Sequence, residues 1–296
     1  MKIIFSRYYT VRTPGHVFRA DKFEAALNLL LKEGVILKKD VLIPKAPSKA
    51  DLLLAHSPAW VKKGFGGGFS AKDSERAQLQ INRSVVRAHL MNTGGTILAA
   101  RLALESGIGI NCGGGAHHAF RGHGEGFCLF NDIAIAIKIL FREKRIKRAM
   151  VIDLDAHQGN GTAAIFRGDG RVFTFSMHGQ EIYPEKKEKS SKDIRLKPGT
   201  GDSAYLSALK RQLPSAIKRF KPDFIVYVAG VDVYKRDLLG GLGLTMGGIK
   251  ARDAFVFSLC RSRGIPVGLV LAGGYAKEFS ETVRLHANTI KAALKA

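Results

Sequence analysis

Short, continuously apolar runs that alternate with longer segments of helical spacing constrain the fold of this chain more than any other feature. The apolar runs are Ile108–Cys112, Ala149–Leu154, Val172–Ser176, Phe224–Ala229 and Val267–Leu271. Runs this short and this apolar are typical of strands buried on both faces, as in a parallel sheet. The segments of helical spacing cover roughly Ser84–Glu105, Asp132–Phe141, Ser203–Phe220, Gly248–Arg263 and Lys277–Leu294. The alternation predicts an α/β fold with a mostly parallel, doubly wound sheet flanked by helices.

No linker divides the chain. It has 296 residues, of which 46% are hydrophobic, and this is enough for one large core. The Gly-rich segment Gly64–Phe69 and the charged segment Glu185–Lys192 are too short for domain boundaries, and we interpret both as surface loops. We therefore expect a single domain over residues 1–296.

Cysteine content and hydropathy indicate a soluble protein of a reducing compartment. The three cysteines, Cys112, Cys128 and Cys260, form no Cys-x-x-Cys pair and are too few for a disulfide framework. The first residues contain no apolar stretch of signal-peptide length, and runs such as Ile133–Leu140 are much shorter than a membrane span. We expect a cytoplasmic location.

The chain is strongly basic, with 47 Lys and Arg against 25 Asp and Glu and a formal charge of +22. A surface of this charge attracts anionic molecules, such as an acidic protein partner, nucleic acid or a membrane face. Binding of nucleic acid through charge alone would be non-specific. The charge therefore predicts a positive electrostatic field around the protein but no particular activity. The sequence does not predict the oligomeric state.

Polar side chains and glycines follow four of the predicted strands. In parallel α/β sheets, ligands bind at the carboxyl ends of the strands, so these loops are the candidate functional segments. They are Gly113–His118, Asp153–Asn160, Ala229–Asp232 and Ala272–Tyr275.

The second of these loops carries a candidate metal site. Side chains alternate along an extended strand, so Asp153 and Asp155 point the same way and His157 extends the row. Asp232, after another strand, is a candidate third ligand, and two Asp with one His are the ligand count of a catalytic zinc site with an open position. In the alternative interpretation, Asp155 caps a helix near Gly161, His157 is an ordinary polar loop residue and Asp232 is a turn residue.

Two neighbouring histidines and one tyrosine complete the candidate site. His117 and His118 follow three glycines, and histidine is the side chain whose unperturbed pKa lies nearest neutrality, which favours a role in proton transfer. Tyr275 follows two glycines that would let its loop carry the hydroxyl to a substrate carbonyl. The alternatives are solvated loop histidines and a tyrosine that only packs.

These segments together resemble the zinc-dependent histone deacetylase family. The similarity runs from about Phe5 to Leu285 and keeps the family's order of motifs. The matching segments are Gly113–Ala119, Gly126–Cys128, Asn131–Asp132, Asp153–His157, Ala229–Asp232, Leu239–Leu242 and Gly273–Tyr275. The resemblance implies the three-layer arginase/deacetylase fold.

The resemblance also implies roles for individual residues. Asp155, His157 and Asp232 would hold Zn²⁺, or Fe²⁺ in its place, with a bound water. His118 would be the general base, and the Tyr275 hydroxyl would stabilise the oxyanion.

Further roles follow from the same resemblance. His117, held by Asp153, would stay charged or assist protonation of the leaving amine. Gly126, Phe127 and Tyr183 would bind the substrate, and the rings of Phe127 and Tyr183 would form the walls of a tunnel for an acylated lysine. A structural K⁺ site would be built, largely from main-chain carbonyls, around Asp153, Asp155, His157, Ser176 and Met177.

Two segments resemble the class IV deacetylases and their bacterial relatives in particular: Gln158–Asn160 and Ile182–Pro184. Asn160 stands where most members of the family place a carboxylate beside the second histidine. Because a neutral amide does not stabilise an imidazolium, we expect His118 to be neutral more readily.

The predicted activity is metal-dependent removal of acetyl or longer acyl groups from lysine side chains of proteins. The alternatives are a catalytically silent protein that binds acyl-lysine or an anionic partner, and a deacetylase of small acylated amines. Because the chain is basic, we rank cationic polyamine substrates below acyl-lysine proteins. Arginase-like enzymes use Asp-x-His-x-Asp, but Gly159 stands at the last position here, and no complete nucleotide-binding Gly motif is present.

Overall fold

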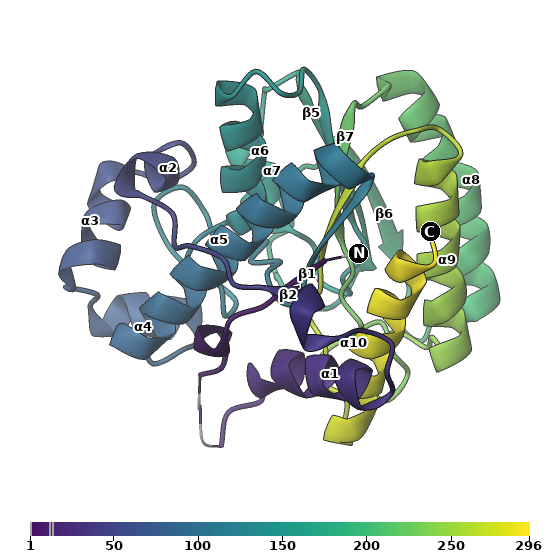
Figure 1. Ribbon diagram of the computed structural model, residues 1–296, viewed down its shortest axis with the longest axis horizontal. Coiled ribbons are helices and arrows are strands. Elements are labelled where there is room, and N and C mark those ends of the chain that lie inside the picture. The colour runs from purple at the N-terminus through teal and green to yellow at the C-terminus, as the bar shows by residue number, and fades with distance from the viewer. Residues whose placement is uncertain (1, 12, 14) are drawn as a thin grey trace.

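A single parallel sheet forms the centre of the molecule. The computed structural model describes residues 2–11, 13 and 15–296 (Figure 1). Within these residues, eight strands pair in the order β2-β1-β3-β8-β7-β4-β5-β6, and every pairing is parallel. The strands are β1 Ile3–Ile4, β2 Val41–Leu42, β3 Ile108–Asn111, β4 Ala149–Asp153, β5 Val172–Gly179, β6 Lys192–Leu196, β7 Phe224–Val228 and β8 Val267–Val270. The predicted fold class is confirmed.

The five predicted strands are the central strands β3, β8, β7, β4 and β5. The strands that the sequence did not predict lie outside them. β1 and β2 have two residues each, which is too short for a recognisable apolar run. β6 has no such run because it carries charged residues of the kind that protect a sheet edge. The predicted surface loop Glu185–Lys192 is wrong at its last residue, because Lys192 begins β6.

Ten α-helices surround the sheet in the described part of the chain. They are α1 Asp21–Lys32, α2 Lys49–Leu53, α3 Pro58–Gly66, α4 Ala71–Ala77, α5 Arg83–Ser106, α6 Asp132–Arg142, α7 Asn160–Ile165, α8 Asp202–Phe220, α9 Met246–Arg261 and α10 Phe279–Leu294. The five predicted helices correspond to α5, α6, α8, α9 and α10. Helix α9 begins before the predicted Gly248 because the Thr245 side chain caps it by accepting a hydrogen bond from the Gly248 amide.

The predicted loop Gly64–Phe69 is wrong over its first three residues. Helix α3 starts with the Ser57 cap and Pro58 and continues to Gly66. Gly64 lies against the ring of Phe130, and a Cβ atom at this position would come within 2.6 Å of that ring. This glycine therefore serves close helix packing, and it is part of α3 instead of the predicted loop.

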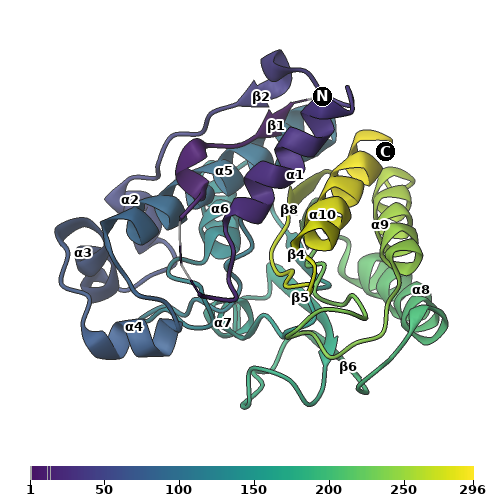
Figure 2. The same ribbon diagram turned by 90° about the horizontal axis from the view of Figure 1, so that it is seen from below.

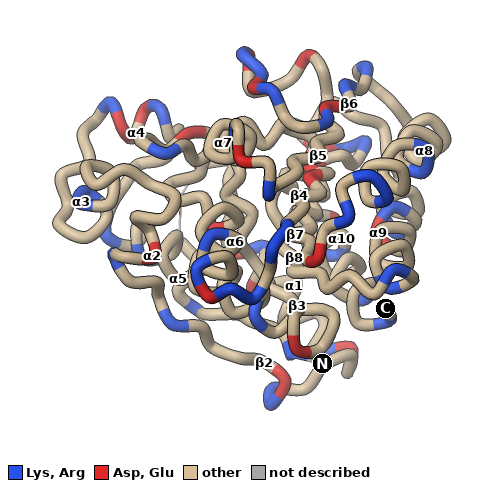
Figure 3. Tube along the Cα trace, turned by 90° about the horizontal axis from the view of Figure 1, so that it is seen from above, with Lys and Arg blue, Asp and Glu red and all other residues tan. Residues whose placement is uncertain are grey.

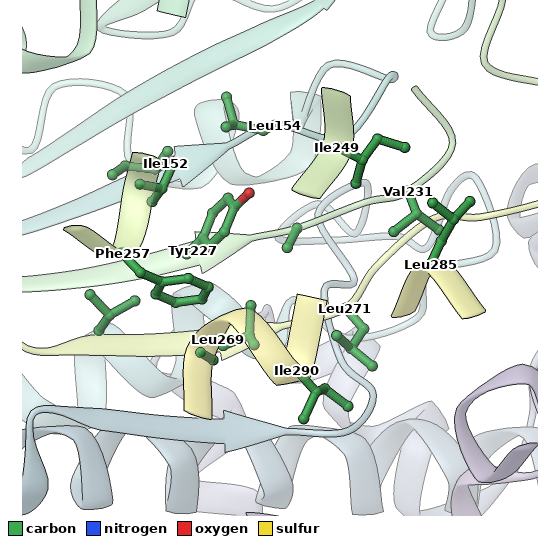
Figure 4. Close-up of a cluster of buried hydrophobic side chains, with 14 of the residues drawn as sticks. Ile152, Leu154, Tyr227, Val231, Ile249, Phe257, Leu269, Leu271, Leu285 and Ile290 are labelled. Carbon is green, nitrogen blue, oxygen red and sulfur yellow. The ribbon is translucent and has the colours of Figure 1, made fainter. Parts of the chain in front are cut away.

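Helices cover both faces of the sheet, which gives three layers. In Figure 1, α5 and α6 lie on one side and α8, α9 and α10 on the other, and Figure 2 shows α1 beside α10. Met150 and Ile152 of β4 belong to the core beneath α8, α9 and α10, whereas Val151 between them belongs to the core beneath α5 and α6. Figure 4 shows the first core, with side chains of β4, β7 and β8 packed against α9 and α10. Burial on both faces explains the continuously apolar strands.

The described Lys and Arg residues lie on the outside of these layers, except for the buried Lys22 and Arg252. Figure 3 shows Lys and Arg along several outer helices and loops, with fewer Asp and Glu between them. None of the helices in the part of the chain that the structure describes combines the length and the hydrophobicity needed to cross a lipid bilayer.

Candidate active site

Three buried side chains converge where β4 and β7 end side by side. Asp155 and His157 lie in the loop after β4, and Asp232 lies in the loop after β7. His157 Nδ1 is 3.1 Å from Asp155 Oδ1 and 3.0 Å from Asp232 Oδ2. One ligand atom from each residue lies within 4.8 Å of the others. The tertiary structure thus brings together all three predicted metal ligands.

Backbone groups hold the two carboxylates of this cluster in place. The Gly273 amide donates to Asp155 Oδ2 at 2.8 Å, and the Ala156 amide donates to Asp232 Oδ1 at 2.8 Å. A Cβ atom at Gly273 would lie 2.1 Å from the nearest oxygen of Asp232, so only glycine permits this approach. The loop after β8 therefore supports the cluster as well as carrying Tyr275.

The charge balance of the cluster fits a divalent cation. Burial, followed by the nearby Asp155 carboxylate, raises the pKa of Asp232 to about 6. Burial would lower the pKa of His157, but Asp155 and Asp232 outweigh it and raise this pKa to about 10. Two carboxylates and an imidazole are ligands that Zn²⁺ and Fe²⁺ accept. Helix α7 takes Gly159 as its N-cap, so Asp155 does not have the capping role of the alternative interpretation.

The two adjacent histidines have different partners. His117 Nδ1 lies 2.8 Å from Asp153 Oδ2, whereas His118 Nδ1 lies 2.7 Å from Asn160 Oδ1. Both rings are buried, and their centroids are 4.0 Å apart. Asp153 thus turns toward His117 instead of joining the cluster of Asp155, His157 and Asp232, and Asn160 reaches His118 from the start of α7.

These partners and burial separate the charge states of the histidines. Burial would lower the pKa of His117, but the Asp153 and Asp155 carboxylates outweigh it and raise the value to about 9. Burial, followed by the charges of His117 and His157, lowers the pKa of His118 well below its usual value. The expected neutral His118 is therefore explained mainly by burial, and the absence of a carboxylate at Asn160 is not its main cause.

A cavity of about 450 Å³ opens onto the cluster, and both histidines, Asp155, His157 and Tyr275 line it. Phe127 and Tyr183 line its walls. The Tyr183 ring packs edge-on against His118 with centroids 4.9 Å apart. Gly126 has a φ of 49°, and a Cβ atom there would lie 2.6 Å from the His118 ring, so glycine is required between the cavity wall and His118. Asp153, Asn160 and Asp232 lie behind this lining.

Two further residues hold the loop of Tyr275, and the sequence analysis missed both. The Tyr275 amide donates to Asp237 Oδ2 at 2.6 Å. The buried ammonium of Lys22 donates to the carbonyls of Ala272 and Gly274, each at 3.1 Å, and lies 4.7 Å from the centre of the Tyr275 ring. The signal for Lys22 was a lysine among the apolar positions of α1, whereas nothing in the sequence pattern distinguished Asp237.

The residues predicted for a K⁺ site come from β4, from the loop that follows it and from the neighbouring β5. Asp153 of β4 is directly opposite Ser176 of β5, and Met177 follows it in the core. The Ser176 hydroxyl is 2.9 Å from His178 Nδ1.

Comparisons with known proteins agree with this arrangement. Residues 16–290 match the model of the histone deacetylase domain. The chain is 34% identical to histone deacetylase 2 of Arabidopsis thaliana, with 96% of this chain and 76% of that protein covered. It is 41% identical to an uncharacterized protein of Picosynechococcus, with 97% and 95% covered. It is also 30% identical to the acetoin utilization protein AcuC of Staphylococcus aureus, with 88% and 72% covered.

The fold has a close counterpart among solved structures. The crystal structure of the HDA15 HD domain superposes with a TM-score of 0.80 and covers 100% of this chain and 90% of that one. The sequences are 23% identical over this superposition, so the likeness concerns the fold. The arginase/deacetylase-like architecture expected from the sequence is thereby confirmed.

Proposed function

Because this chain belongs to the histone deacetylase family, we propose that it is a metal-dependent hydrolase that removes acyl groups from lysine side chains of proteins. One observation carries the proposal: a single cavity combines a buried cluster of two carboxylates and an imidazole with the neutral His118 and the hydroxyl of Tyr275. Metal ligands, a base and a hydroxyl donor are the groups that hydrolysis of an amide by water requires.

We assign Zn²⁺ or Fe²⁺ to Asp155, His157 and Asp232. When bound, such an ion supplies a Lewis acid that polarises the amide carbonyl and lowers the pKa of a water molecule. The protein's own contribution is the placement of the ligands. Burial of all three keeps competing solvent away, and the amides of Gly273 and Ala156 orient the two carboxylates.

His118 acts as the general base in this proposal. Its Nδ1–H donates to Asn160 Oδ1, so Nε2 is left free to accept a proton from the attacking water. The depressed pKa keeps this imidazole neutral at pH 7. His117, charged and held by Asp153, supplies the proton that the leaving lysine amine needs.

Tyr275 supplies the hydrogen bond to the oxyanion. Burial, followed by the Asp155 carboxylate, raises the pKa of this hydroxyl well above its usual value, so it stays protonated and can donate. The contacts of Lys22 and Asp237 hold the loop that carries it.

The walls of the cavity support the substrate class that we propose. The rings of Phe127 and Tyr183 suit the methylene chain of a lysine, and the acylated nitrogen carries no charge that would oppose burial. The formal charge of +22 disfavours cationic polyamines, so acyl-lysine proteins, including those with an acidic surface, are the substrates we propose.

Three finer assignments belong to the same proposal. We place the chain with the class IV deacetylases and their bacterial relatives because of Gln158–Asn160 and Ile182–Pro184. We assign K⁺ to the main chain around Asp153 and Ser176, which lie opposite each other in β4 and β5. A reducing, cytoplasmic location suits three cysteines that are free and buried.

Hydrolysis of acetyl-lysine and longer acyl-lysine peptides by the metal-loaded chain tests this function. We expect turnover that a chelator abolishes and that added Zn²⁺ or Fe²⁺ restores. The matched control is the Tyr275→Phe variant, which keeps the ring and loses the hydroxyl, and it should bind metal normally but turn over slowly. Metal-loaded protein that binds acyl-lysine peptides without hydrolysing them, or that hydrolyses only acylated small amines, would contradict the proposal.

A further inference from the structure

Glu125 connects two parts of the cavity through one carboxylate oxygen. Its Oε1 accepts a hydrogen bond from Asn160 Nδ2 at 2.8 Å and another from the Tyr183 hydroxyl at 2.7 Å. Its Oε2 lies 3.3 Å from His123 Nε2. Asn160 is the partner of His118, and Tyr183 is the cavity wall that packs on the same histidine. The Glu125 side chain therefore contacts both Asn160, which is the hydrogen-bond partner of His118, and Tyr183, which is a wall of the cavity.

We propose that Glu125 is a positioning residue, which holds the Asn160 amide and the Tyr183 ring in their contacts with the His118 imidazole. The inference deepens the function proposed above and rests on it for its kinetic consequences. The hydrogen-bonding arrangement itself is a property of the folded protein and can be tested without substrate.

Glu125 fixes the orientation of the Asn160 amide. An ionised carboxylate only accepts hydrogen bonds, so Glu125 requires the NH₂ group of Asn160 on its side. The Gly161 amide donates to Asn160 Oδ1 at 3.0 Å and requires the oxygen on the other side. With Oδ1 directed to His118, the imidazole must carry its proton on Nδ1, which leaves Nε2 free as a base.

Glu125 also holds the Tyr183 wall of the cavity. The ring stands nearly perpendicular to the His118 ring, at 86°, and its edge contact is kept by a hydroxyl that ends on Glu125. Without that acceptor, the hydroxyl loses its partner and the ring is free to move away from the base. Burial would raise the pKa of Glu125, but hydrogen bonds from His123, Tyr183 and Asn160 outweigh it and keep the carboxyl ionised at neutral pH.

The backbone around Glu125 is suited to a fixed position. The amide of Glu125 donates to the Cys128 carbonyl at 3.0 Å, and the amide of Cys128 donates to the Glu125 carbonyl at 2.8 Å. Between them, Gly126 and Phe127 both adopt positive φ, at 49° and 66°. This tight turn carries both Phe127 and Glu125. The turn therefore supplies one wall of the cavity, Phe127, and the residue that holds the other wall, Tyr183.

The kinetic test compares Glu125→Leu with Glu125→Gln in the full, metal-loaded chain. Glutamine keeps an oxygen that can accept from both Asn160 and Tyr183, whereas leucine has a similar volume and no acceptor. We expect Glu125→Gln to keep most of the activity and Glu125→Leu to lower kcat by about 10- to 100-fold with a smaller change in KM, since a small misplacement of a catalytic group costs this much. The matched control is Glu105→Gln, at an exposed site near the C-terminal end of α5, and it should leave kcat and KM unchanged.

A second measurement keeps the inference separate from the proposed function. The ¹⁵N signals of the His118 imidazole, assigned by comparison with His118→Gln, report which nitrogen carries the proton. We expect the neutral Nδ1–H form in the native chain and in Glu125→Gln, and a mixture of tautomers in Glu125→Leu. A folded Glu125→Leu variant with native tautomer and native kcat would overturn the inference, and so would equal damage by leucine and glutamine. If the native chain hydrolyses no acyl-lysine peptide, the proposed function fails while the imidazole signals still decide the role of Glu125.

Discussion

The imidazole rings of His117 and His118 lie with their centroids 4.0 Å apart, and yet only His117 is charged at neutral pH. Both are buried, which disfavours the charged form of each. Two carboxylates compensate for burial at His117, whereas the hydrogen-bond partner of His118 is the neutral Asn160 amide, and His118 faces the positive charge of its neighbour. A charged acid beside a neutral base is the pairing that the proposed amide hydrolysis uses.

Replacement of His118 by alanine should lower kcat far more than it changes KM. A general base acts in the transition state and contributes about 10²- to 10⁴-fold to the rate. Steady-state kinetics with an acyl-lysine peptide measures both constants, and metal analysis of the variant serves as the control. A raised KM with unchanged kcat would identify His118 as a binding residue instead.

Asn160→Asp should move the acidic limb of the kcat/KM profile to higher pH. A new negative charge stabilises the His118 imidazolium and raises its pKa, commonly by roughly 1–3 units for an opposite charge in contact, and the base works only when neutral. However, Asn160 Nδ2 lies 2.8 Å from Glu125 Oε1, so the new carboxylate would share a proton with Glu125 and lose part of its charge. The shift should therefore be larger in Asn160→Asp combined with Glu125→Gln.

The pH profiles of the native chain and of the two variants measure this difference. Because His117, Asp153 and the metal site titrate in the same field, we predict the direction and the order of the shifts. An acidic limb that stays in place in the metal-loaded double variant would show that position 160 does not control the protonation of His118.

Metal binding should release about one proton at neutral pH and weaken as the pH falls. Burial lowers the pKa of His157, but Asp155 and Asp232 outweigh it and raise the value to about 10, so the imidazole is protonated before the metal binds. A metal must displace this proton, and apparent affinity should fall about tenfold for each pH unit below that value. Calorimetric titration of the chelated protein in buffers of different ionisation enthalpy measures the release. Asp232→Ala should abolish binding and activity, and stoichiometric binding by that variant would refute the ligand assignment.

Lys22→Met should lower kcat and change how stability depends on pH. Methionine keeps an apolar chain of similar size but leaves the carbonyls of Ala272 and Gly274 without the ammonium, so the Tyr275 loop is held less firmly. Burial lowers the pKa of Lys22 to about 8 in the folded, metal-free chain, below its value of 10.5 when exposed. The unfolded chain therefore binds more protons between these values, and this residue makes the free energy of unfolding rise with pH over that window. Denaturant titrations at about pH 7.5 and 10 should show a smaller rise in Lys22→Met, and an equal rise would exclude this role.

Local patterns were sufficient for the centre of the fold and for the motif-bearing loops. Continuous apolar runs predicted β3, β4, β5, β7 and β8 because those strands are buried on both faces and need no partner to be recognised. The loops that follow four of them carry the metal-ligand, histidine and tyrosine candidates, since parallel strands end at one edge. The two-residue strands β1 and β2 and the charged β6 had no such pattern, because pairing with a neighbour is what makes each of them a strand.

Only the tertiary structure decided which side chains complete the site and which of its groups carry charge. Glu125, Lys22 and Asp237 act through contacts with residues 35 to 252 positions away, and no local pattern contains such distances. The charge states of His117 and His118 follow from burial and from the positions of carboxylates on other loops. Residue types and spacing can therefore predict which groups are available for catalysis. Their protonation depends on electrostatic energies that exist only once the chain has folded and excluded water from between them.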